Sequence, residues 1–475
     1  MSPLFPTLLP ELALGLGGMA LLMFGVLAKG NQFITCSLAS VALFAVTGVF
    51  VLLAPAGVVF DGLLTTTDFT RYADVLVLLG AAAALILSLD YNQREDIARF
   101  EFPVLVVMAV LGMIVMISAS DMMTLYLGFE LQSLALYICA AFARDSLRST
   151  EAGLKYFVLG ALASGLLIYG ISLVYGFAGT TNFAALAKEL NASQGAGYGT
   201  VIGVVFVLVG IAFKISAAPF HMWTPDVYEG APTPVTSLFG TAPKVAAMAL
   251  LISVMMGPFG HLLNQWQVLI EILSIVSMAI GALGAISQTN IKRLMAYSSI
   301  GHMGYALIGL AAGTEAGVQA TLVYLAIYIV MSFGVFACII AMRRKEQAVE
   351  TIADLAGLST QKPGYALALA VLLWSMAGIP PLSGFFSKLY VFSAAINAGL
   401  DTLAVVGVLT SVMAAYYYLR VIKVMYFDSG SPDFDRAAGG VRLVMLAGAL
   451  ATVFFVFIPG PLVSAAAAAA HALMG

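Results

Sequence analysis

The feature that most constrains this chain is its repetition of long apolar runs, separated by short polar segments. Of its 475 residues, 61% are hydrophobic and only 9% are charged, whereas a soluble domain carries about 25% charged residues. So few charged side chains cannot cover a water-facing surface, but they suit a surface that faces lipid. A run of about 20 apolar residues is long enough to cross the hydrocarbon core as a helix. The sequence therefore predicts an all-α polytopic membrane protein.

The apolar runs predict about 14 transmembrane helices in a single transmembrane domain that comprises residues 1–475. Their predicted limits are 8–28, 33–54, 72–90, 102–119, 122–142, 153–178, 199–229, 235–257, 266–287, 292–311, 317–342, 363–397, 402–427 and 441–463. The net charge of −3 is small and spread along the chain, so nothing in it favours nucleic acid as a partner.

Two of the predicted spans are too long for one crossing, and each contains proline. The span 199–229 contains Pro219, and the span 363–397 contains Pro380 and Pro381. Proline removes a backbone donor and clashes with the preceding turn, so both helices are expected to be broken at membrane depth. Lipid cannot bind the freed carbonyl groups, so each break should face protein or a water-filled cavity.

The two broken helices lie five spans apart, which suggests a duplicated five-helix unit. The two copies would be spans 4–8, about 102–257, and spans 9–13, about 266–427, flanked by 8–90 and 441–463. Because each unit has an odd number of helices, the second copy would be inverted in the membrane. Inverted repeats with broken helices are a recurrent plan of transporters, with the working site at the breaks.

The basic residues predict an orientation for this arrangement. If the N-terminus lies outside, most Lys and Arg residues fall in inside segments, including Arg343 and Arg344, whereas Arg71 and Lys188 fall outside. The positive-inside rule therefore places both termini on the outer side of the membrane.

Four charges fall near the middle of predicted spans: Glu130, Lys214, Lys244 and Lys388. Each costs at least about 2.5–3.5 kcal/mol to insert at that depth. One interpretation is a structural ion pair of Glu130 with one lysine, but this leaves two lysines without an acid. We therefore expect the set to be functional. Pro243 directly precedes Lys244 and is expected to bend its span and make room for water.

Lysine suits a proton path because burial in an apolar medium disfavours its charged form. A buried lysine can then be charged or neutral at physiological pH, depending on nearby charges. Glu130 close to Lys214 would hold a proton on that lysine, and separation of the pair would favour its release. Lys244 and Lys388 could relay the proton by the same logic, through water between the helices.

His302 and His221 are secondary candidates. His302 lies in mid-span and has an ordinary pKa of about 6.5, but it could equally be a hydrogen-bonded core histidine. His221 lies just past the first break and could cap freed carbonyl groups there. The three cysteines lie alone in apolar runs, and no metal, haem, flavin or nucleotide motif is present in the sequence. The tyrosines 416–418 are expected to pack or to anchor the membrane interface.

Three stretches together resemble the antiporter-like subunits of respiratory NADH–quinone oxidoreductase (complex I). Residues 220–234 read FHMWTPDVYEGAPTP and are followed by Ala242-Pro-Lys244. Residues 378–388 read GIPPLSGFFSK, and residues 291–299 read IKRLMAYSS. The first stretch is similar to the subunit-N branch of the family, not to subunits M or L. The length of the chain agrees, because only a short Ala-rich tail follows the last predicted span.

This resemblance implies a proton channel with Glu130 and Lys214 as its charged pair, Lys244 as the central relay and Lys388 as the exit-side lysine. It implies a subunit of a translocase of the respiratory chain, in the inner membrane of a bacterium, with both termini periplasmic. The chain itself would hold no cofactor and no redox centre, since FMN and the iron–sulfur clusters lie on other subunits. Its partners would be other membrane subunits, including neighbouring antiporter-like subunits, with quinone reached only through the complex.

Two other functions remain open at this stage. A subunit of a multisubunit cation/proton antiporter would share the fold and the lysines. A non-pumping membrane scaffold would only space its neighbours, but it would gain stability if its central charges were replaced by apolar residues.

Overall fold

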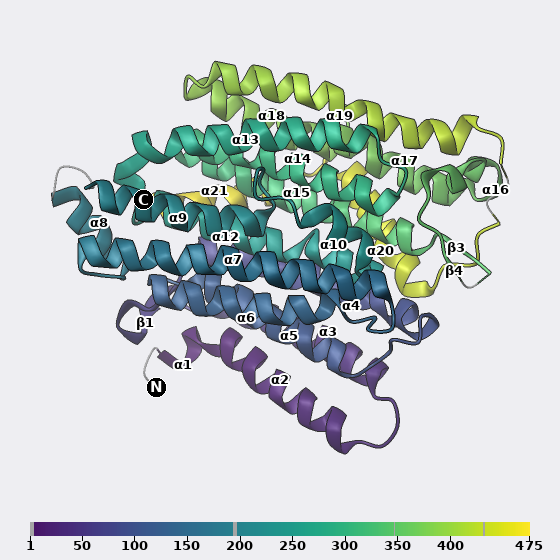
Figure 1. Cartoon of the computed structure of the whole chain (residues 1–475), viewed down its shortest axis with the longest axis horizontal. Helices are drawn as coiled ribbons and strands as arrows, with labels where there is room; N and C mark the ends of the chain where they lie inside the picture. The colour runs from purple at the N-terminus through teal and green to yellow at the C-terminus, as the bar shows by residue number, and fades with distance from the viewer. Residues whose placement is uncertain (1–3, 193–196, 346, 431–432) are drawn as a thin grey trace.

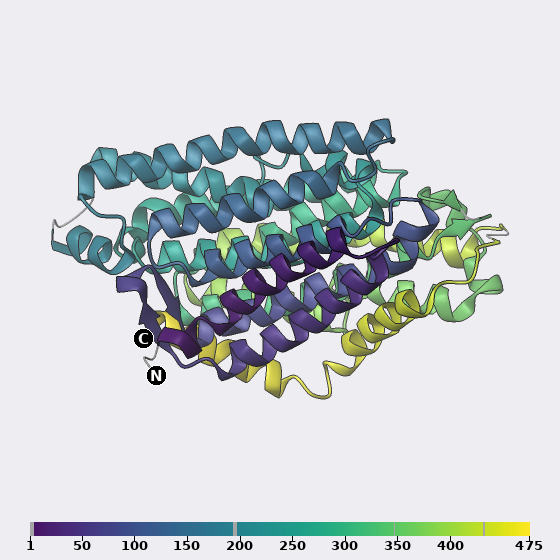
Figure 2. The ribbon, with the colours of Figure 1, turned by 90° about the horizontal axis from the view of Figure 1, so that it is seen from below.

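The chain forms one helical bundle in which the long helices run roughly parallel to one another (Figures 1 and 2). The structure is a computed structural model, and it describes residues 4–192, 197–345, 347–430 and 433–475. The long helices are α2 (Leu9–Leu27), α3 (Phe33–Leu53), α4 (Asp68–Arg94), α5 (Glu101–Ser118), α6 (Met122–Ala140), α7 (Leu147–Ala178), α9 (Tyr198–Ile215), α12 (Ala242–Met256), α13 (Leu263–Ile286), α14 (Ile291–Ala311), α15 (Glu315–Ile340), α17 (Pro363–Ala377), α18 (Ser383–Asn397), α19 (Asp401–Phe427), α20 (Gly439–Phe454) and α21 (Gly460–Met474).

Shorter elements connect these helices. The short helices are α1 (Leu4–Thr7), α8 (Phe183–Ala192), α10 (Thr224–Gly230), α11 (Thr233–Phe239) and α16 (Leu358–Gln361), with 3₁₀ turns at Phe60–Gly62, Gly260–Leu262 and Ile352–Leu355. Two small antiparallel hairpins complete the described elements, formed by β1 (Gly57–Val59) with β2 (Leu64–Thr66) and by β3 (Arg343–Arg344) with β4 (Gln347–Ala348).

The all-α membrane fold predicted from the sequence is confirmed, since each predicted span coincides with one helix or with a pair of consecutive helices. Within the described residues, 11 helical segments are long and apolar enough to cross a membrane. The total of about 14 crossings stays a prediction, because several of the remaining apolar helices are shorter than a full crossing.

Polar side chains fix where several of these helices begin. Thr67, Asp121, Asn290 and Thr314 each accept hydrogen bonds from backbone N–H groups in the first turn of α4, α6, α14 and α15. The first N–H groups of a helix have no partner within the helix, so such a cap stabilises it by about 1 kcal/mol.

Glycines allow two pairs of neighbouring helices to approach closely. A Cβ atom on Gly112 of α5 would lie 2.5 Å from the backbone nitrogen of Gln132 on α6. A Cβ atom on Gly281 of α13 would lie 2.5 Å from the backbone nitrogen of Gly301 on α14. Because lipid is as apolar as the side chains, helices in a membrane associate through such close backbone packing.

Both predicted helix breaks are present. The first separates α9, which ends at Ile215, from α10, which begins at Thr224. The second separates α17, which ends at Ala377, from α18, which begins at Ser383. The freed carbonyl groups bind donors from the protein, as expected: Trp223 Nε1 donates to Phe213 O at 3.0 Å.

Two features of the predicted spans were wrong. The span 235–257 is not merely bent at Pro243 but interrupted before it, at Gly240 and Thr241, because a proline favours the first turn of a new helix. Lys244 therefore lies in the first turn of α12. Residues 464–474 are not a tail, because they belong to α21, which buries Ala466, Ala469 and Ala470 and packs against α4 and α15.

The two ends of the bundle differ in what they carry. We call the end that holds both chain termini and α8 the terminal end, and the end that holds β3 and β4 the hairpin end (Figure 1). Arg343 and Arg344 form β3, so the basic segment predicted to lie inside is at the opposite end of the bundle from the termini. This agrees with the relative placement that the basic residues predict.

The orientation in the membrane can be tested with single cysteines in a chain without its native cysteines. A cysteine at position 344 is expected to react with a membrane-impermeant maleimide only from the cytoplasm, and one at the exposed position 475 only from the periplasm. Labelling is measured in whole cells and in inverted vesicles. Reaction at position 344 in whole cells would contradict the predicted orientation.

Candidate functional site

The three lysines predicted to be functional are buried where helices end or begin. Lys214 lies in the last turn of α9, Lys244 in the first turn of α12, and Lys388 in the second turn of α18. Their residues are 2%, 0% and 4% exposed. None of the three could extend its ammonium group to an interface, so the protein interior must stabilise each charge.

Lys244 and Lys388 bind the carbonyl groups that the two helix breaks set free. Lys244 Nζ donates a hydrogen bond to Ile215 O, at the end of α9, over 3.1 Å. Lys388 Nζ donates to Ala377 O, at the end of α17, over 3.0 Å, and also to Ser411 Oγ over 2.8 Å. The ammonium group of Lys244, on α12, thus caps the end of α9, and that of Lys388, on α18, caps the end of α17.

Gly378 makes the second of these contacts possible. Its φ is +85°, in the left-handed region, and a Cβ atom there would lie 2.8 Å from Lys388 Cδ. Any larger residue would be strained and would displace the lysine side chain.

Lys214 lies among aromatic rings. Its Nζ is 5.2 Å from the centre of the Phe129 ring, 5.7 Å from that of Tyr137 and 5.4 Å from that of Tyr156. It donates a hydrogen bond to Ser133 Oγ over 2.7 Å. Ring faces attract a cation, so this cage holds a charged ammonium without a carboxylate in direct contact.

Glu130 lies on α6 one turn before Ser133 and is within electrostatic range of Lys214. Its Oε1 accepts a hydrogen bond from Ser164 of α7, whose Oγ atom also lies 3.3 Å from Tyr126 OH. Among the described hydrogen bonds, Lys214 donates to Ser133 and not to Glu130. The two charges predicted as a pair are therefore near one another, but each is hydrogen-bonded to a different serine.

His302 lies at the centre of a cluster of hydroxyl groups. It is buried on α14, with Nδ1 2.7 Å from Tyr324 OH and Nε2 3.1 Å from Tyr418 OH. Tyr418 OH also bonds to Ser298 Oγ. Both Lys244 and Lys388 lie within electrostatic range of His302.

Tyr305 extends the cluster from His302 to the last lysine. Its ring centre is 4.7 Å from Lys388 Nζ, and its hydroxyl group donates to Thr410 Oγ1 over 3.4 Å. Tyr305 therefore connects His302 to Lys388, because its ring contacts both side chains.

His221 lies in the first break, and the structure does not make it the principal cap there. The carbonyl groups of Phe213 and Ile215 accept hydrogen bonds from Trp223 and Lys244 instead. His221 is half-buried, and its Nδ1 has no hydrogen-bond partner within the described protein.

A group of ion pairs holds α10 at the hairpin end. Asp226 lies 2.7 Å from both Lys155 and Arg293, and Arg293 also lies 3.0 Å from Glu229. Burial disfavours the Asp226 carboxylate, but the hydrogen bonds from Lys155 and Arg293 outweigh it and hold the pKa of Asp226 below its usual range. These ion pairs fix the second half of the broken helix.

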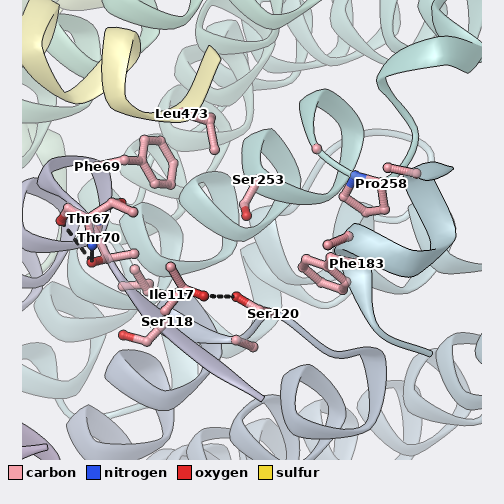
Figure 3. A pocket seen from close by; sticks show the side chains of 15 residues that line it. Thr67, Phe69, Thr70, Ile117, Ser118, Ser120, Phe183, Ser253, Pro258 and Leu473 are labelled. Carbon is pink, nitrogen blue, oxygen red and sulfur yellow. Dashed lines mark hydrogen bonds between the residues drawn. The ribbon is translucent and has the colours of Figure 1, made fainter. Parts of the chain in front are cut away.

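Two cavities open at opposite ends of the bundle. At the hairpin end, a cavity of about 800 Å³ is lined by Tyr91, Glu229, Pro232, Lys292 and Glu350, among others. At the terminal end, a cavity of about 270 Å³ is lined mainly by apolar atoms, with several hydroxyl groups among them; there Ser120 bonds to Thr65 over 2.5 Å (Figure 3). Neither cavity is lined by the three buried lysines.

Sequence reasoning missed the hydroxyl groups of the site. Ser133 and Ser164 bind the charged pair, and Tyr324 and Tyr418 bind His302. Tyr418, which was expected to pack or to anchor the interface, is buried and in addition bonds to His302. A spacing signal existed only for Ser133, which lies one turn after Glu130.

No site for a metal ion is evident in the part of the chain that the structure describes. It contains no group of three or more His, Cys, Asp or Glu side chains suited to a metal. Cys36, Cys139 and Cys338 are buried and free.

Comparison with known proteins shows the family of this chain. A family model described as "NADH:quinone oxidoreductase/Mrp antiporter, TM" matches residues 119–414. The chain is 64% identical, over 99% of its length and 98% of the relative's, to NADH-quinone oxidoreductase subunit N 1 of Acidiphilium cryptum. It is 57% identical to NADH-quinone oxidoreductase subunit N of Rhodospirillum rubrum, over 98% of this chain and 96% of that protein.

Among solved structures, a chain of respiratory complex I from Thermus thermophilus matches with a TM-score of 0.83 and 31% identity, covering 97% of this chain and 99% of that chain. The residues that the family model matches include Glu130 and all three buried lysines, and the two relatives match nearly the whole chain. The chain therefore belongs to the antiporter-like membrane subunits of NADH–quinone oxidoreductase, in the branch of subunit N.

Proposed function

We propose that this chain translocates protons across the membrane as subunit N of a bacterial NADH–quinone oxidoreductase, along a path through Glu130, Lys214, Lys244, His302 and Lys388. The observation that carries the proposal is the position of the three buried lysines at helix breaks. Their hydrogen bonds go to carbonyl and hydroxyl oxygens, not to carboxylates. Such contacts stabilise an ammonium group less than an ion pair would, so each proton can be released.

Protons would cross the gaps between these residues on water. Ser216, Thr224 and Ser237 are buried around the first break and the start of α12, and their hydroxyl groups have no hydrogen-bond partner among the described residues. Buried polar groups of this kind usually bind ordered water. The cavity at the hairpin end would supply protons to this region, and Lys388 would release them on the other side. His221 would have a supporting role at the first break.

The remaining parts of the proposal concern the assembly. The membrane would be the bacterial inner membrane, with both termini periplasmic, and the two five-helix units would be inverted repeats at 102–257 and 266–427. Neighbouring antiporter-like subunits would be its direct partners. FMN and iron–sulfur clusters would lie on other subunits, so quinone and NADH would act on this chain only through the complex.

The alternative is a subunit of a multisubunit cation/proton antiporter, because the description of the matching family model names the Mrp antiporter together with NADH:quinone oxidoreductase. A chain of the Mrp complex from a Dietzia species matches with a TM-score of 0.85 over the full length of both chains. At 20% identity this match shows the fold alone.

Purification of the chain with its native partners decides between the two functions. We expect an affinity-tagged chain to copurify with a complex that contains flavin and iron–sulfur clusters and that acidifies proteoliposomes when NADH and quinone are added. Recovery with other membrane subunits but without any NADH-oxidising activity would contradict the proposal and favour the antiporter.

A further inference from the structure

Four buried hydroxyl groups near Lys244 and His302 have no part in the lysine path as described so far. We call them the hydroxyl bridge; they belong to Tyr228 of α10, Ser299 of α14, and Tyr328 and Ser332 of α15. None of these four residues is more than 3% exposed. They come from three helices, and no hydrogen bond is described that links Lys244 directly to His302.

The hydroxyl bridge reaches Lys244 through Tyr228. Lys244 Nζ is 6.0 Å from the centre of the Tyr228 ring. The same ring centre is 6.5 Å from that of Phe336 on α15. Ser332 lies one helical turn before Phe336 and therefore shares its face of α15. Tyr228 thus contacts both the ammonium group and the face of α15 that carries Ser332.

The bridge reaches His302 through Tyr328, which lies one turn before Ser332 on the same face of α15. The hydroxyl groups of Tyr328 and Ser299 are 2.8 Å apart, and the Tyr328 ring centre is 5.2 Å from that of the His302 imidazole. Tyr324, a further turn away, bonds to His302 Nδ1 over 2.7 Å. Helix α15 therefore presents hydroxyl groups on three successive turns that end at the imidazole.

Two groups of the bridge, Tyr228 OH and Ser332 Oγ, have no hydrogen-bond partner among the described residues. A buried hydroxyl group without a partner is destabilising, and an apolar side chain would fill the same space without that cost. Buried groups of this kind usually bind ordered water. Ser299 and Tyr328 both lie within electrostatic range of Tyr228. Water among these groups would thus complete a hydrogen-bonded connection from Lys244 to His302.

Other tyrosines that pack against α15 have a different kind of partner. Tyr365 donates a hydrogen bond to Cys338 O, and Tyr72 donates to Leu322 O over 3.1 Å. A backbone carbonyl group accepts a hydrogen bond but has no proton to pass on. The neighbours of the bridge are hydroxyl groups, an ammonium group and an imidazole, all of which exchange protons. Their chemistry therefore goes beyond packing.

We propose that Tyr228 and Tyr328 carry protons between Lys244 and His302, an inference that extends the proposed function and rests on it. Lys244 Nζ gives a proton to the neighbouring water or hydroxyl group, and each oxygen along the bridge accepts one proton and gives up another. The last proton passes from Tyr324 OH to His302 Nδ1. Lys244 is left as a neutral amine and His302 as an imidazolium. Both tyrosines of the bridge end each transfer neutral, so no phenolate remains in the apolar interior.

Tyr228→Phe and Tyr328→Phe test the proposal, because each keeps the ring and removes only the hydroxyl group. We expect each to lower NADH-driven proton pumping by the intact purified complex in proteoliposomes about tenfold, because a positioned hydroxyl group is replaced by mobile water. Electron transfer from NADH to artificial acceptors should stay unchanged. The double variant should lose no more than the worse single variant, since both hydroxyl groups belong to one connection. Tyr365→Phe, which removes a buried hydroxyl group on the same helix face-to-face contact with α15, is the matched control and should pump normally.

Lys244→Arg, prepared alongside, separates a failure of this inference from a failure of the proposed function. If it loses pumping while both tyrosine variants pump at the original rate, the hydroxyl bridge is structural and the lysine path stands. If Lys244→Arg also pumps normally, the proposed function itself fails. Losses that multiply in the double variant, or an equal loss in Tyr365→Phe, would show that the hydroxyl groups act through packing and would overturn the proposal. Tyr228→Phe keeps the test valid if Tyr328→Phe fails to assemble, because the Tyr228 hydroxyl group leaves no described partner unbonded.

Discussion

Lys244→Arg is expected to reduce NADH-driven proton pumping at least about tenfold, a change of about 1.4 kcal/mol in the barrier, while the complex still assembles. Arginine can donate to Ile215 O as Lys244 does, but its guanidinium group stays protonated at physiological pH and cannot pass its proton on. Lys244→Ala should also stop pumping without unfolding the chain, since it removes a desolvated charge. Pumping is measured in proteoliposomes after equal assembly has been confirmed.

Lys292→Arg provides the matched control for this experiment. Lys292 is also buried and donates to two backbone carbonyl groups, but it forms an ion pair with Glu350 over 2.9 Å. Arginine would maintain that ion pair, so pumping should persist. Full pumping by Lys244→Arg would show that a fixed charge suffices there, and the relay would have to be abandoned.

Lys214→Met and Glu130→Gln are expected to lower proton pumping and coupled quinone reduction by at least about tenfold, with assembly largely intact. Methionine fills the space among Phe129, Tyr137 and Tyr156 without a charge, so the packing of the cage is retained. Glutamine keeps an oxygen that can accept the hydrogen bond from Ser164. A loss of proton pumping in these two variants would therefore be caused by the missing charges and not by altered packing. The alanine variants of both residues should show the same loss.

Electron transfer from NADH to artificial acceptors serves as the internal control for this pair. That reaction does not need the membrane subunits to pump, so it should continue in both variants. If both variants assembled and pumped normally, the charged pair would be structural, and the path would have to begin elsewhere.

The sequence predicted the parts of this fold that depend on local chemistry. The breaks near Pro219 and at Pro380–Pro381 follow from the missing backbone donor of proline, and both are present. The interruption before Pro243 was mistaken for a bend, because a proline inside an apolar run reads equally as a kink or as the first turn of a new helix. Gly460 and Pro461 start α21 in the same way, inside the last predicted span, so this helix continues into what looked like a tail.

The candidate site was predictable only as a set of residues, not as a set of contacts. The cost of a charge at membrane depth singled out Glu130, Lys214, Lys244 and Lys388. Their partners come from distant segments, as when Lys388 of α18 donates to Ser411 of α19. Three consecutive tyrosines cannot be told apart by type, yet Tyr416 is exposed and Tyr418 is buried against His302. Only the rotation of α19 in the bundle decides which of them joins the site.

The ammonium groups at the ends of α9 and α17 make the backbone sensitive to charge. The end of a helix carries about half a negative charge, and a cation beside it is stabilising by about 0.3–1 kcal/mol at the surface and by up to about 2 kcal/mol when partly buried. When Lys244 or Lys388 loses its proton, the half-helix that it caps loses this stabilisation, although a neutral amine can still donate a hydrogen bond. The passage of a proton would thus loosen first one broken helix and then the other. Each proton transfer along the path would thus change the stability of a helix end as well as the charge of a lysine.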